Sequence, residues 1–295
     1  MPLLAHVGSG VFEPLQVFGV TAFGALYAIR AANLAREGRA LPRWRIASYF
    51  TGLLLILAVF ISPVAHIGEE LVLAHMIQHL VAGDIAALLI VLGLTRSVLQ
   101  PILAIRFFDR MRALTLPMVA LPLWVANLYI WHIPTFYEAA VTSPAAHALQ
   151  HTMFIAFGVL MWMPVAGPLP VPSWFGGGAQ LGYTIASRLA GAGLGNYLMW
   201  AGTPLYPVYE PGQRYWGISP LTDQGTAGVI MMVESGFVTL GVLAFVILRW
   251  AANDSEKQRL LDLASERGVE LTPERAERAV RAGHATRLEE RLKSS

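Results

Sequence analysis

The sequence has no cysteine among its 295 residues and carries little charge. The absence of cysteine excludes disulfide bonds, thiolate metal sites, Cys-x-x-Cys redox chemistry and iron–sulfur ligation. Only 14% of the residues are charged whereas 55% are hydrophobic, and the mean hydropathy is +0.54. These values are typical of a membrane protein, in which a bound metal would need histidine, methionine, carboxylate or backbone-oxygen ligands.

The first residues, MPLLAHVGSGVFEP, lack the basic segment and the small-residue cleavage site of a removable signal peptide. We therefore expect the first span to direct insertion. Long apolar runs recur along the chain, and about 18–20 apolar residues can cross the ~30 Å hydrocarbon core as a helix. Since backbone groups within lipid must be hydrogen-bonded internally, the sequence predicts an all-α fold, a polytopic membrane helical bundle.

Seven transmembrane helices are predicted. They cover approximately residues 14–34, 46–65, 70–94, 115–132, 145–166, 180–203 and 221–250. Arginines gather in the first loop and in the loop before the fourth span, whereas the alternate connections are mostly acidic. By the positive-inside rule, the N-terminus is expected outside and the C-terminus in the cytoplasm.

Composition divides the chain into two parts. Residues 1–252 form the predicted seven-helix transmembrane domain, and residues 253–295 form a charged helical cytoplasmic tail. The tail alone carries nine basic and nine acidic residues, and its helical periodicity predicts a solvated helical hairpin or a surface for a partner.

Two loops and one small-residue face are also predicted. Residues 97–114 are expected to form an amphipathic helix at the cytoplasmic interface. The Pro/Gly-rich residues 167–178 are expected to form a turn. In the sixth span, Ser187, Gly191 and Gly195 recur every four residues, which allows another helix, internal or from a partner, to approach closely.

The motif His-x-x-Gln-His occurs twice, once in the third span and once in the fifth. Both spans enter from the outside, so His75 and His79 lie about 7 and 13 Å deep, and His147 and His151 about 4 and 10 Å deep. Residues four apart share a helix face. Because polar groups at membrane depth are functional candidates, these four histidines predict an outward-facing intramembrane metal site.

Seven of the eight histidines lie in the outer half of the predicted membrane domain or outside it, and only His284 is cytoplasmic. His132 closes the fourth span and is expected to complete or gate the metal site. His66 closes the second span, and His6 lies in the outer N-terminal segment. For these two, a hydrogen-bonded interfacial role competes with an accessory role at the site.

Copper is the metal that imidazole combined with thioether suits best, and Met76 and Met153 stand beside the histidine pairs. Both methionines could equally fill the core. Gln78 and Gln150 are expected either to orient the imidazoles or to form simple hydrogen bonds between helices. Zinc, which histidine also binds, and haem held between two helices stay open as alternatives.

A second polar set is predicted deeper in the membrane. Asp84, Glu234 and Arg188 lie at similar levels, and intramembrane charges usually pair. We therefore expect an ion pair between Arg188 and one of the two carboxylates, serving structure rather than a proton relay. Asp223 lies near the outer surface on nearly the same face as Glu234, where it could bind metal or cap a helix.

Four segments resemble signature segments of the CtaG-type assembly factors of caa-type cytochrome c oxidases. They are HMIQHL, WHIPTFYEAA, HALQHTMFIAFGVLMWMP and SPLTDQGTAGVIMM, and the resemblance covers about residues 50–245. The matching positions are His75, His79, Trp131, His132, Pro134, Tyr137, His147, His151, Asp223 and Gln224. Among them, Trp131, Tyr137 and Gln224 are expected to support the residues that hold the metal. The last segment departs from the family at Met231-Met232, where Met-Trp is more usual, and the charged tail lies outside the resemblance.

The resemblance implies a seven-span protein of the bacterial cytoplasmic (inner) membrane that helps to mature the oxidase, and we expect it to do so by supplying copper. Its expected partners are oxidase subunits or a copper chaperone, with the lipid bilayer around it and no nucleic acid. No nucleophile motif or phosphate-binding loop is evident, so we do not expect an enzyme.

Three alternatives stay open. A b-type haem redox protein would use the histidines as axial ligands. A zinc-dependent intramembrane hydrolase would need a carboxylate such as Glu138 or Asp223 to activate water. A proton-coupled transporter would depend on Asp84, Arg188 and Glu234.

Overall fold

The computed structural model describes residues 14–61, 63–281 and 283–294, and His6 lies outside them, as does the proposed signal-free N-terminus up to residue 13. Every regular element within these residues is a helix, which confirms the all-α expectation. The elements are α2 (Pro14–Arg36), α3 (Arg43–Ile61), α4 (Pro63–Glu70), α5 (Val72–Leu80), η1 (Val81–Ala86), α6 (Ala87–Gly93), α7 (Arg96–Leu103), α8 (Arg106–Met111), η2 (Arg112–Thr115), α9 (Pro117–Trp131), α10 (Pro134–Thr142), α11 (Pro144–Ala166), α12 (Gly177–Trp200), η3 (Pro207–Tyr209), α13 (Glu210–Trp216), α14 (Pro220–Glu266), α15 (Pro273–Arg281) and α16 (Ala285–Ser294).

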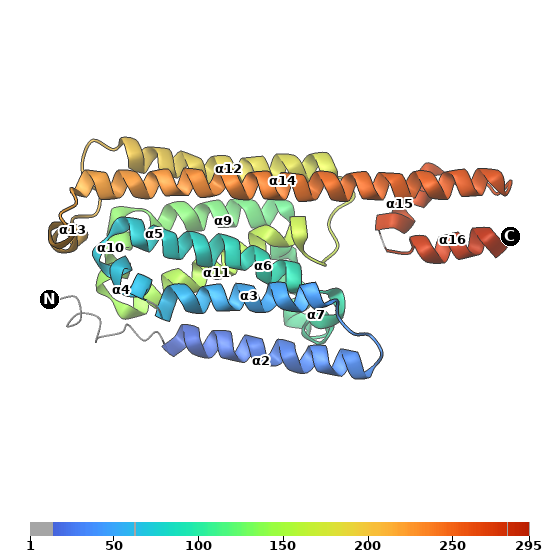
Figure 1. Cartoon of the computed structure of the whole chain (residues 1–295), viewed down its shortest axis with the longest axis horizontal. Coiled ribbons are helices and arrows are strands. Elements are labelled where there is room, and N and C mark those ends of the chain that lie inside the picture. Colours follow the sequence, from blue (N-terminus) through green and yellow to red (C-terminus); the bar gives the residue numbers. More distant parts are fainter. Residues whose placement is uncertain (1–13, 62, 282, 295) are drawn as a thin grey trace.

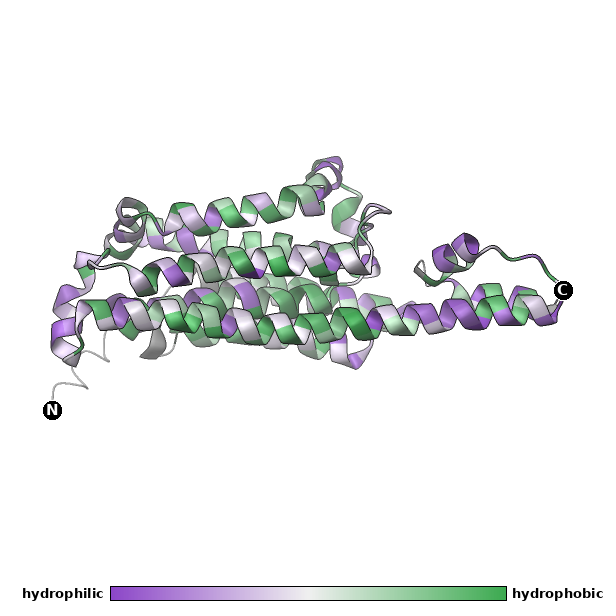
Figure 2. Cartoon of the chain, turned by 90° about the horizontal axis from the view of Figure 1, so that it is seen from above, coloured by the Kyte–Doolittle hydropathy of each residue, from purple (hydrophilic) through white to green (hydrophobic). Residues whose placement is uncertain are grey.

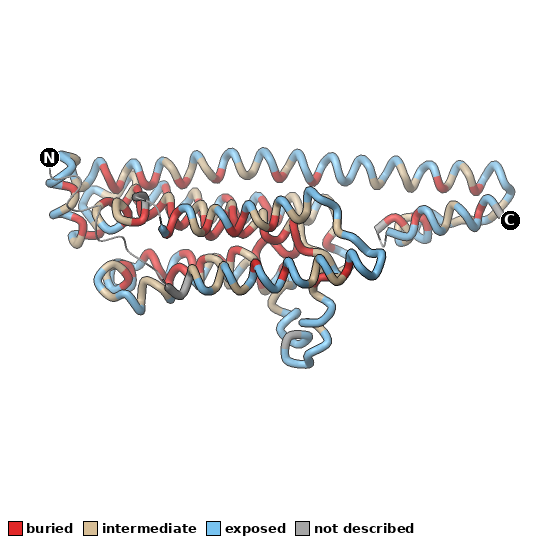
Figure 3. Tube along the Cα trace, turned by 60° about the horizontal axis from the view of Figure 1, so that its bottom comes forward, coloured by how far each residue is buried: buried red, intermediate tan, exposed pale blue. Residues whose placement is uncertain are grey.

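The long helices run side by side, with α12 and α14 on one side of the bundle and α2 and α3 on the other (Figure 1). The start of α5 lies with α10 and α13 at one end of the bundle. The tail helices α15 and α16 lie beyond the opposite end. Buried residues concentrate where the bundle helices pack, and most of the long helix leading into the tail is exposed (Figure 3).

Five helices in the described residues are long and apolar enough to cross a membrane, which confirms a membrane protein. A sixth span results if residues 109–115 and 117–131, which meet at a 72° bend, count as one. The expected count of seven is not confirmed. The helix α12 is not among the five, because glycines and polar residues such as Gln180, Arg188 and Asn196 dilute its apolar character. Figure 2 shows the hydrophobic bundle and the hydrophilic tail.

The third span is continuous from Val72 to Gly93 but contains a π-helical turn, η1. Such turns insert one residue into an α-helix and are frequent at functional sites. Here the turn separates His79, on α5, from the apolar helix α6, and it carries the buried Asp84. The sequence pattern did not reveal it.

The two predictions for the connections between helices have different outcomes. Residues 97–114 form two short helices and a 3₁₀ turn rather than a single amphipathic helix, since α7 ends at Leu103 and α8 begins at Arg106. Residues 167–176 contain no helix, as the Pro/Gly-rich composition indicated.

Glycines allow two close helix contacts. A side chain at Gly158 of α11 would collide with the backbone oxygen of Gly83 in η1, and Gly195 of α12 faces Gly228 of α14 in the same way. The small-residue face of α12 therefore serves a contact within the bundle. These contacts bring α11 against η1, beside the histidine pairs.

The helix α14 has 47 residues, so it is about 70 Å long and crosses the compositional boundary at residue 252 without a break. The helices α15 and α16 fold back on its final turns around a small core of Leu260, Ala264, Val280, Ala285 and Leu292. The tail is thus a three-helix unit formed by the end of α14 together with α15 and α16.

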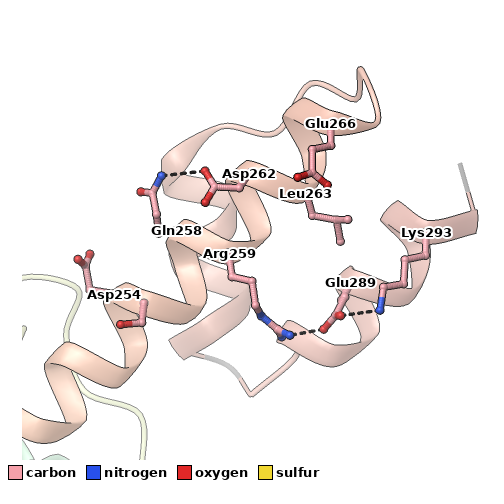
Figure 4. A pocket seen from close by; sticks show the side chains of 9 residues that line it. Asp254, Gln258, Arg259, Asp262, Leu263, Glu266, Glu289 and Lys293 are labelled. Atoms are coloured by element: carbon pink, nitrogen blue, oxygen red, sulfur yellow. Dashed lines mark hydrogen bonds and ion pairs between the residues drawn. The ribbon is translucent and has the colours of Figure 1, made fainter.

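Glu289 of α16 links the tail helices (Figure 4). Its carboxylate lies 2.7 Å from Lys293 Nζ and 2.7 Å from an Arg259 nitrogen on α14. The hydrogen bond from Lys293, together with the charge of Arg259, lowers the pKa of the Glu289 carboxyl.

Acidification is expected to loosen α16. Because the pKa of Glu289 is lowered on folding, its contribution is complete above the unfolded value of about 4.3 and is lost as the pH falls through the lower folded value. The protection of α16 amides, measured relative to the exchange rate of an unstructured peptide at the same pH, should therefore fall below about pH 4 in the wild type. In Glu289→Gln this protection should already be low at neutral pH. The exposed neighbour variant Glu290→Gln is the control, and equal behaviour of the two variants would contradict the role of Glu289.

Candidate metal centre

Three histidines from two helices meet inside the bundle. His75 and His79 of α5 and His151 of α11 each offer a ring nitrogen, and these nitrogens all lie within 4.8 Å of one another. The exposed fractions of the three side chains are 1%, 5% and 1%. We call this set the histidine triad.

The rings are arranged around one point. Ring centroids are 4.3 Å apart for His75 and His79, 5.2 Å for His79 and His151, and 5.8 Å for His75 and His151. Within the described residues, Nε2 of His75 and both ring nitrogens of His79 have no hydrogen-bond partner. A buried polar atom without a partner is costly, so this donor set fits a metal ion that would take up the lone pairs.

His147 lies at the edge of the triad. Its ring centroid is 4.0 Å from His151 and 5.7 Å from His75, but it is only half-buried and lies outside the compact set of three. The two His-x-x-Gln-His motifs therefore meet, and three of their four histidines converge. The fourth lies between the triad and the surface.

His132, at the end of α9, adds a thioether neighbour. Its Nδ1 lies 2.6 Å from the carbonyl oxygen of Leu128, and its Nε2 lies 3.4 Å from Sδ of Met76. The ring centroid of His132 is 6.4 Å from that of His79. A histidine–methionine pair thus borders the triad, and Met76 itself is fully buried.

Met153 and His66 lie elsewhere. Met153 is partly buried against the hydrophobic core rather than at the triad. His66 lies beside two carboxylates of its own helix, 4.0 Å from Glu69 and 3.6 Å from Glu70. The structure does not bring either residue into the histidine cluster.

The two motif glutamines are both buried. Gln78 donates a hydrogen bond from Nε2 to the carbonyl oxygen of Val59, 3.1 Å away, and so ties α5 to α3. Gln150 lies beside His75. One glutamine therefore forms an interhelical hydrogen bond, and the other is placed where it can orient an imidazole.

Aromatic residues from α10 and from the connection that follows α12 pack beside the triad. Tyr137 of α10 is fully buried, with its ring 5.1 Å from that of His75, and it stacks on Tyr206 at 3.9 Å. The hydroxyls of Tyr209 and Tyr137 are 3.4 Å apart, and the Tyr206 hydroxyl donates to the carbonyl oxygen of His132 at 2.9 Å. Burial raises the pKa of Tyr137 and Tyr209, so both remain neutral hydrogen-bonding groups.

Sequence reasoning missed Tyr206 and Tyr209. They belong to the segment LYPVY in a connection between two spans. Two tyrosines on either side of a proline, in the connection that follows α12, were the available signal. Trp131, which was expected to support the site, is buried at the end of α9 with its ring 6.5 Å from that of Phe136.

Asp223 of α14 holds the first turn of α5. Its carboxylate accepts hydrogen bonds from the backbone N–H of Val72 at 2.9 Å and of Leu73 at 3.0 Å. It also accepts one from Nε2 of Gln213 at 2.9 Å. A carboxylate at a helix N-terminus satisfies free N–H groups and the helix dipole. Asp223 therefore caps the helix that carries His75 and His79, rather than its own helix.

Asp223→Ala is expected to lower the free energy of unfolding by about 2 kcal/mol or more, because it leaves buried backbone donors without an acceptor. The α5 histidines should be displaced with the cap, which would also weaken metal binding. Thermal unfolding in detergent measures the first effect. The control Glu210→Ala removes an exposed carboxylate paired with Arg214, a contact expected to contribute less than about 1 kcal/mol. Equal unfolding midpoints in the two variants would rule out the capping role.

Gln224 acts at a different helix end. Its Oε1 accepts a hydrogen bond from the N–H of Leu205 at 2.7 Å, and its Nε2 donates to the carbonyl oxygen of Leu198 at 3.1 Å. It therefore secures the end of α12 and the start of the tyrosine-bearing connection. Its effect on the histidines is indirect.

The deeper polar residues form a separate cluster. Arg188 of α12 forms a buried ion pair with Asp84, whose Oδ1 also accepts a hydrogen bond from the Trp162 indole at 2.8 Å. The guanidinium lies 5.0 Å from the ring centroid of Trp162 and 5.6 Å from that of Trp124. Glu234 is near both charges, but its oxygens have no hydrogen-bond partner in the described part of the chain.

Comparison with known proteins gives a family match and distant relatives. A family model described as cytochrome c oxidase caa3 assembly factor (Caa3_CtaG) matches residues 25–253. Two relatives, the uncharacterized proteins Mb0105 of Mycobacterium bovis and MT0111 of Mycobacterium tuberculosis, are each 23% identical over 245 residues. Each alignment covers 77% of this chain but only 37% of the relative. No solved structure matches the chain.

Proposed function

Because the chain belongs to the cytochrome c oxidase caa3 assembly factor family, we propose that it binds copper at the histidine triad and passes it to the oxidase during assembly. One observation carries the proposal. Three buried imidazoles, one from α11 and two from α5, offer nitrogens within 4.8 Å of one another, and those of His79 have no other partner in the described residues.

The surroundings of the triad suit a copper ion carried as cargo. The thioether of Met76 is a soft ligand beside an imidazole-rich site, a combination that favours copper over zinc. His75, His79 and His151 would hold the ion. His147, half-buried at the edge, and the His132–Met76 pair are placed to exchange ligands during transfer.

The topology that fits this role has seven spans, with the N-terminus outside and the C-terminus in the cytoplasm of a bacterial inner membrane. The helices α9 and α12 run alongside the other spans, which supports counting them among the seven (Figure 1). The histidine end of the bundle, opposite the charged tail, would then face outward. Oxidase subunits or a separate copper chaperone would be the partners.

On this proposal the chain acts by binding and transfer and is not an enzyme. Three histidines are also a ligand set of catalytic zinc, so a zinc-dependent hydrolase is the second candidate function. Of the two carboxylates expected from the sequence to assist such a reaction, Glu138 and Asp223, the second already accepts three hydrogen bonds in capping α5.

The test is the metal content of the protein purified in detergent, with copper, iron and zinc measured together. The proposal expects about one copper per chain after loading with copper(I) and removal of excess. Iron with a Soret band would point to a haem protein, and zinc alone would point to a hydrolase. Absence of all three metals after loading would overturn the proposed copper site.

A further inference from the structure

An apolar crevice of about 220 Å³ opens between α6, α11 and α14. All ten residues that line it are apolar, among them Leu88 and Leu92 of α6, Val165 of α11, and Val238, Gly241 and Val242 of α14. Aliphatic walls of this kind suit another apolar side chain rather than a polar solute.

The crevice leads to the deep polar cluster. Glu234 lies one helical turn before Val238 on α14, and Asp84 lies four residues before Leu88 in the third span. Ile85, which follows Asp84, and Val238 both line the crevice, so the two carboxyl groups lie toward the same end of it. The charge interaction of Glu234 with Asp84 and Arg188 places the three groups together.

At this end of the crevice, the described residues place two carboxyl groups, Asp84 and Glu234, beside a single cation, Arg188. Arg188 pairs with Asp84, and the Trp162 indole donates to the same carboxylate. Glu234 has no ion pair or hydrogen-bond donor in the described part of the chain, although both of its oxygens are shielded from solvent. A carboxyl group at membrane depth is costly to ionise without a partner, and a basic group brought from outside would stabilise its charged form in an ion pair.

The size of the crevice selects the kind of occupant. Sites for whole small molecules measure about 300–1,000 Å³, so a space of about 220 Å³ does not enclose a complete lipid or quinone. It has room for one or two large side chains. A neighbouring helix could place an apolar side chain in the crevice and a basic one, a turn away, at Glu234.

We propose that the face formed by α6 and α14 receives a transmembrane helix of an unassembled client subunit, one that carries a lysine or arginine within its apolar stretch. The basic side chain pairs with Glu234, and an adjacent apolar side chain fills the crevice. This inference rests on the proposed role in assembly but not on copper binding, since the crevice and the triad use different residues.

The probe is a synthetic poly-leucine transmembrane peptide with one central lysine, labelled for energy transfer to the labelled protein in phosphatidylethanolamine/phosphatidylglycerol vesicles. An all-leucine peptide is the reference. Gly241→Leu fills the crevice, whereas Gly236→Leu lies on the same helix but does not line the crevice. An added Cβ meets nothing within 4 Å at either glycine, so the two variants are matched. Glu234→Gln removes the ionisable carboxyl group.

The lysine peptide should associate with the wild type at least about tenfold more tightly than the all-leucine peptide. The preference should disappear in Glu234→Gln, association should weaken in Gly241→Leu, and Gly236→Leu should match the wild type. No preference for lysine, or equal behaviour of the two glycine variants, would overturn the proposal. So would a co-purified lipid lost only from Gly241→Leu without any peptide association. Copper content measured on the same preparations separates failure of docking from failure of the copper site.

Discussion

Replacement of both α5 histidines, His75→Ala/His79→Ala, is expected to reduce bound copper from about one ion per chain to background. The double variant removes two of the three converging imidazoles, so affinity should fall by about a hundredfold or more, beyond the 10–100-fold typical of losing an outer-sphere partner alone. Elemental analysis after copper(I) loading, together with competition against a copper(I) chelator, measures the loss.

The fifth span offers a matched control for the same prediction. His151 belongs to the triad, whereas His147 lies one turn earlier and is half-buried. His151→Ala should therefore abolish stoichiometric copper, while His147→Ala should retain the ion but pass it to an acceptor more slowly, because a residue placed to exchange ligands during transfer is lost. Equal copper loss in the two variants would contradict a triad that has His147 only at its edge. Full retention of copper in His151→Ala would contradict binding at the histidine triad.

Arg188→Met is expected to lower the free energy of unfolding by about 3–5 kcal/mol, the cost of leaving one member of a buried ion pair without its partner. The variant keeps most of the side-chain volume but leaves Asp84 charged and buried beside Glu234. Chemical unfolding in mixed micelles, or the thermal midpoint in detergent, reports the effect. The exposed pair Glu210–Arg214 supplies the control, since Arg214→Met should change the stability by less than about 1 kcal/mol.

The double variant Arg188→Met/Asp84→Asn makes the prediction specific. Asparagine keeps an oxygen that can accept the Trp162 indole hydrogen bond while the uncompensated charge disappears. The double variant should therefore be more stable than Arg188→Met alone. The free energies of unfolding lost in Arg188→Met and in Asp84→Asn could instead simply add in the double variant. The loss in Arg188→Met would then come from packing against Trp124 and Trp162 rather than from the ion pair.

Several features of the site follow from spacing along a helix. The four-residue spacing in each His-x-x-Gln-His motif places two imidazoles on one face, and parallel entry of two spans at matching depth predicts that the pairs meet. They do meet, with His79 and His151 at 5.2 Å between ring centroids. The expectation that Arg188 would pair with a carboxylate follows from the cost of charge in lipid alone, and the structure selects Asp84 as the partner.

Other features depend on how far one helix is rotated or displaced against its neighbours, which helical period does not encode. The π-helical turn after His79 changes the direction in which Asp84 faces. Asp223 caps α5 from 150 residues away in sequence, and the tyrosines at 206 and 209 reach the site through a loop without regular periodicity.

The sequence by itself determined that this chain is an all-helical membrane protein, that it belongs to an oxidase assembly family, and that its histidines come in two matched pairs. Composition, period-four spacing and short ordered motifs carry that information locally. Only the tertiary structure decided that three histidines converge while a fourth stays at the edge. It likewise placed Met76 beside His132 and left Glu234 without a partner in the described residues. The reason is physical: helix packing at glycine contacts such as Gly83–Gly158 sets which side chains come within bonding distance.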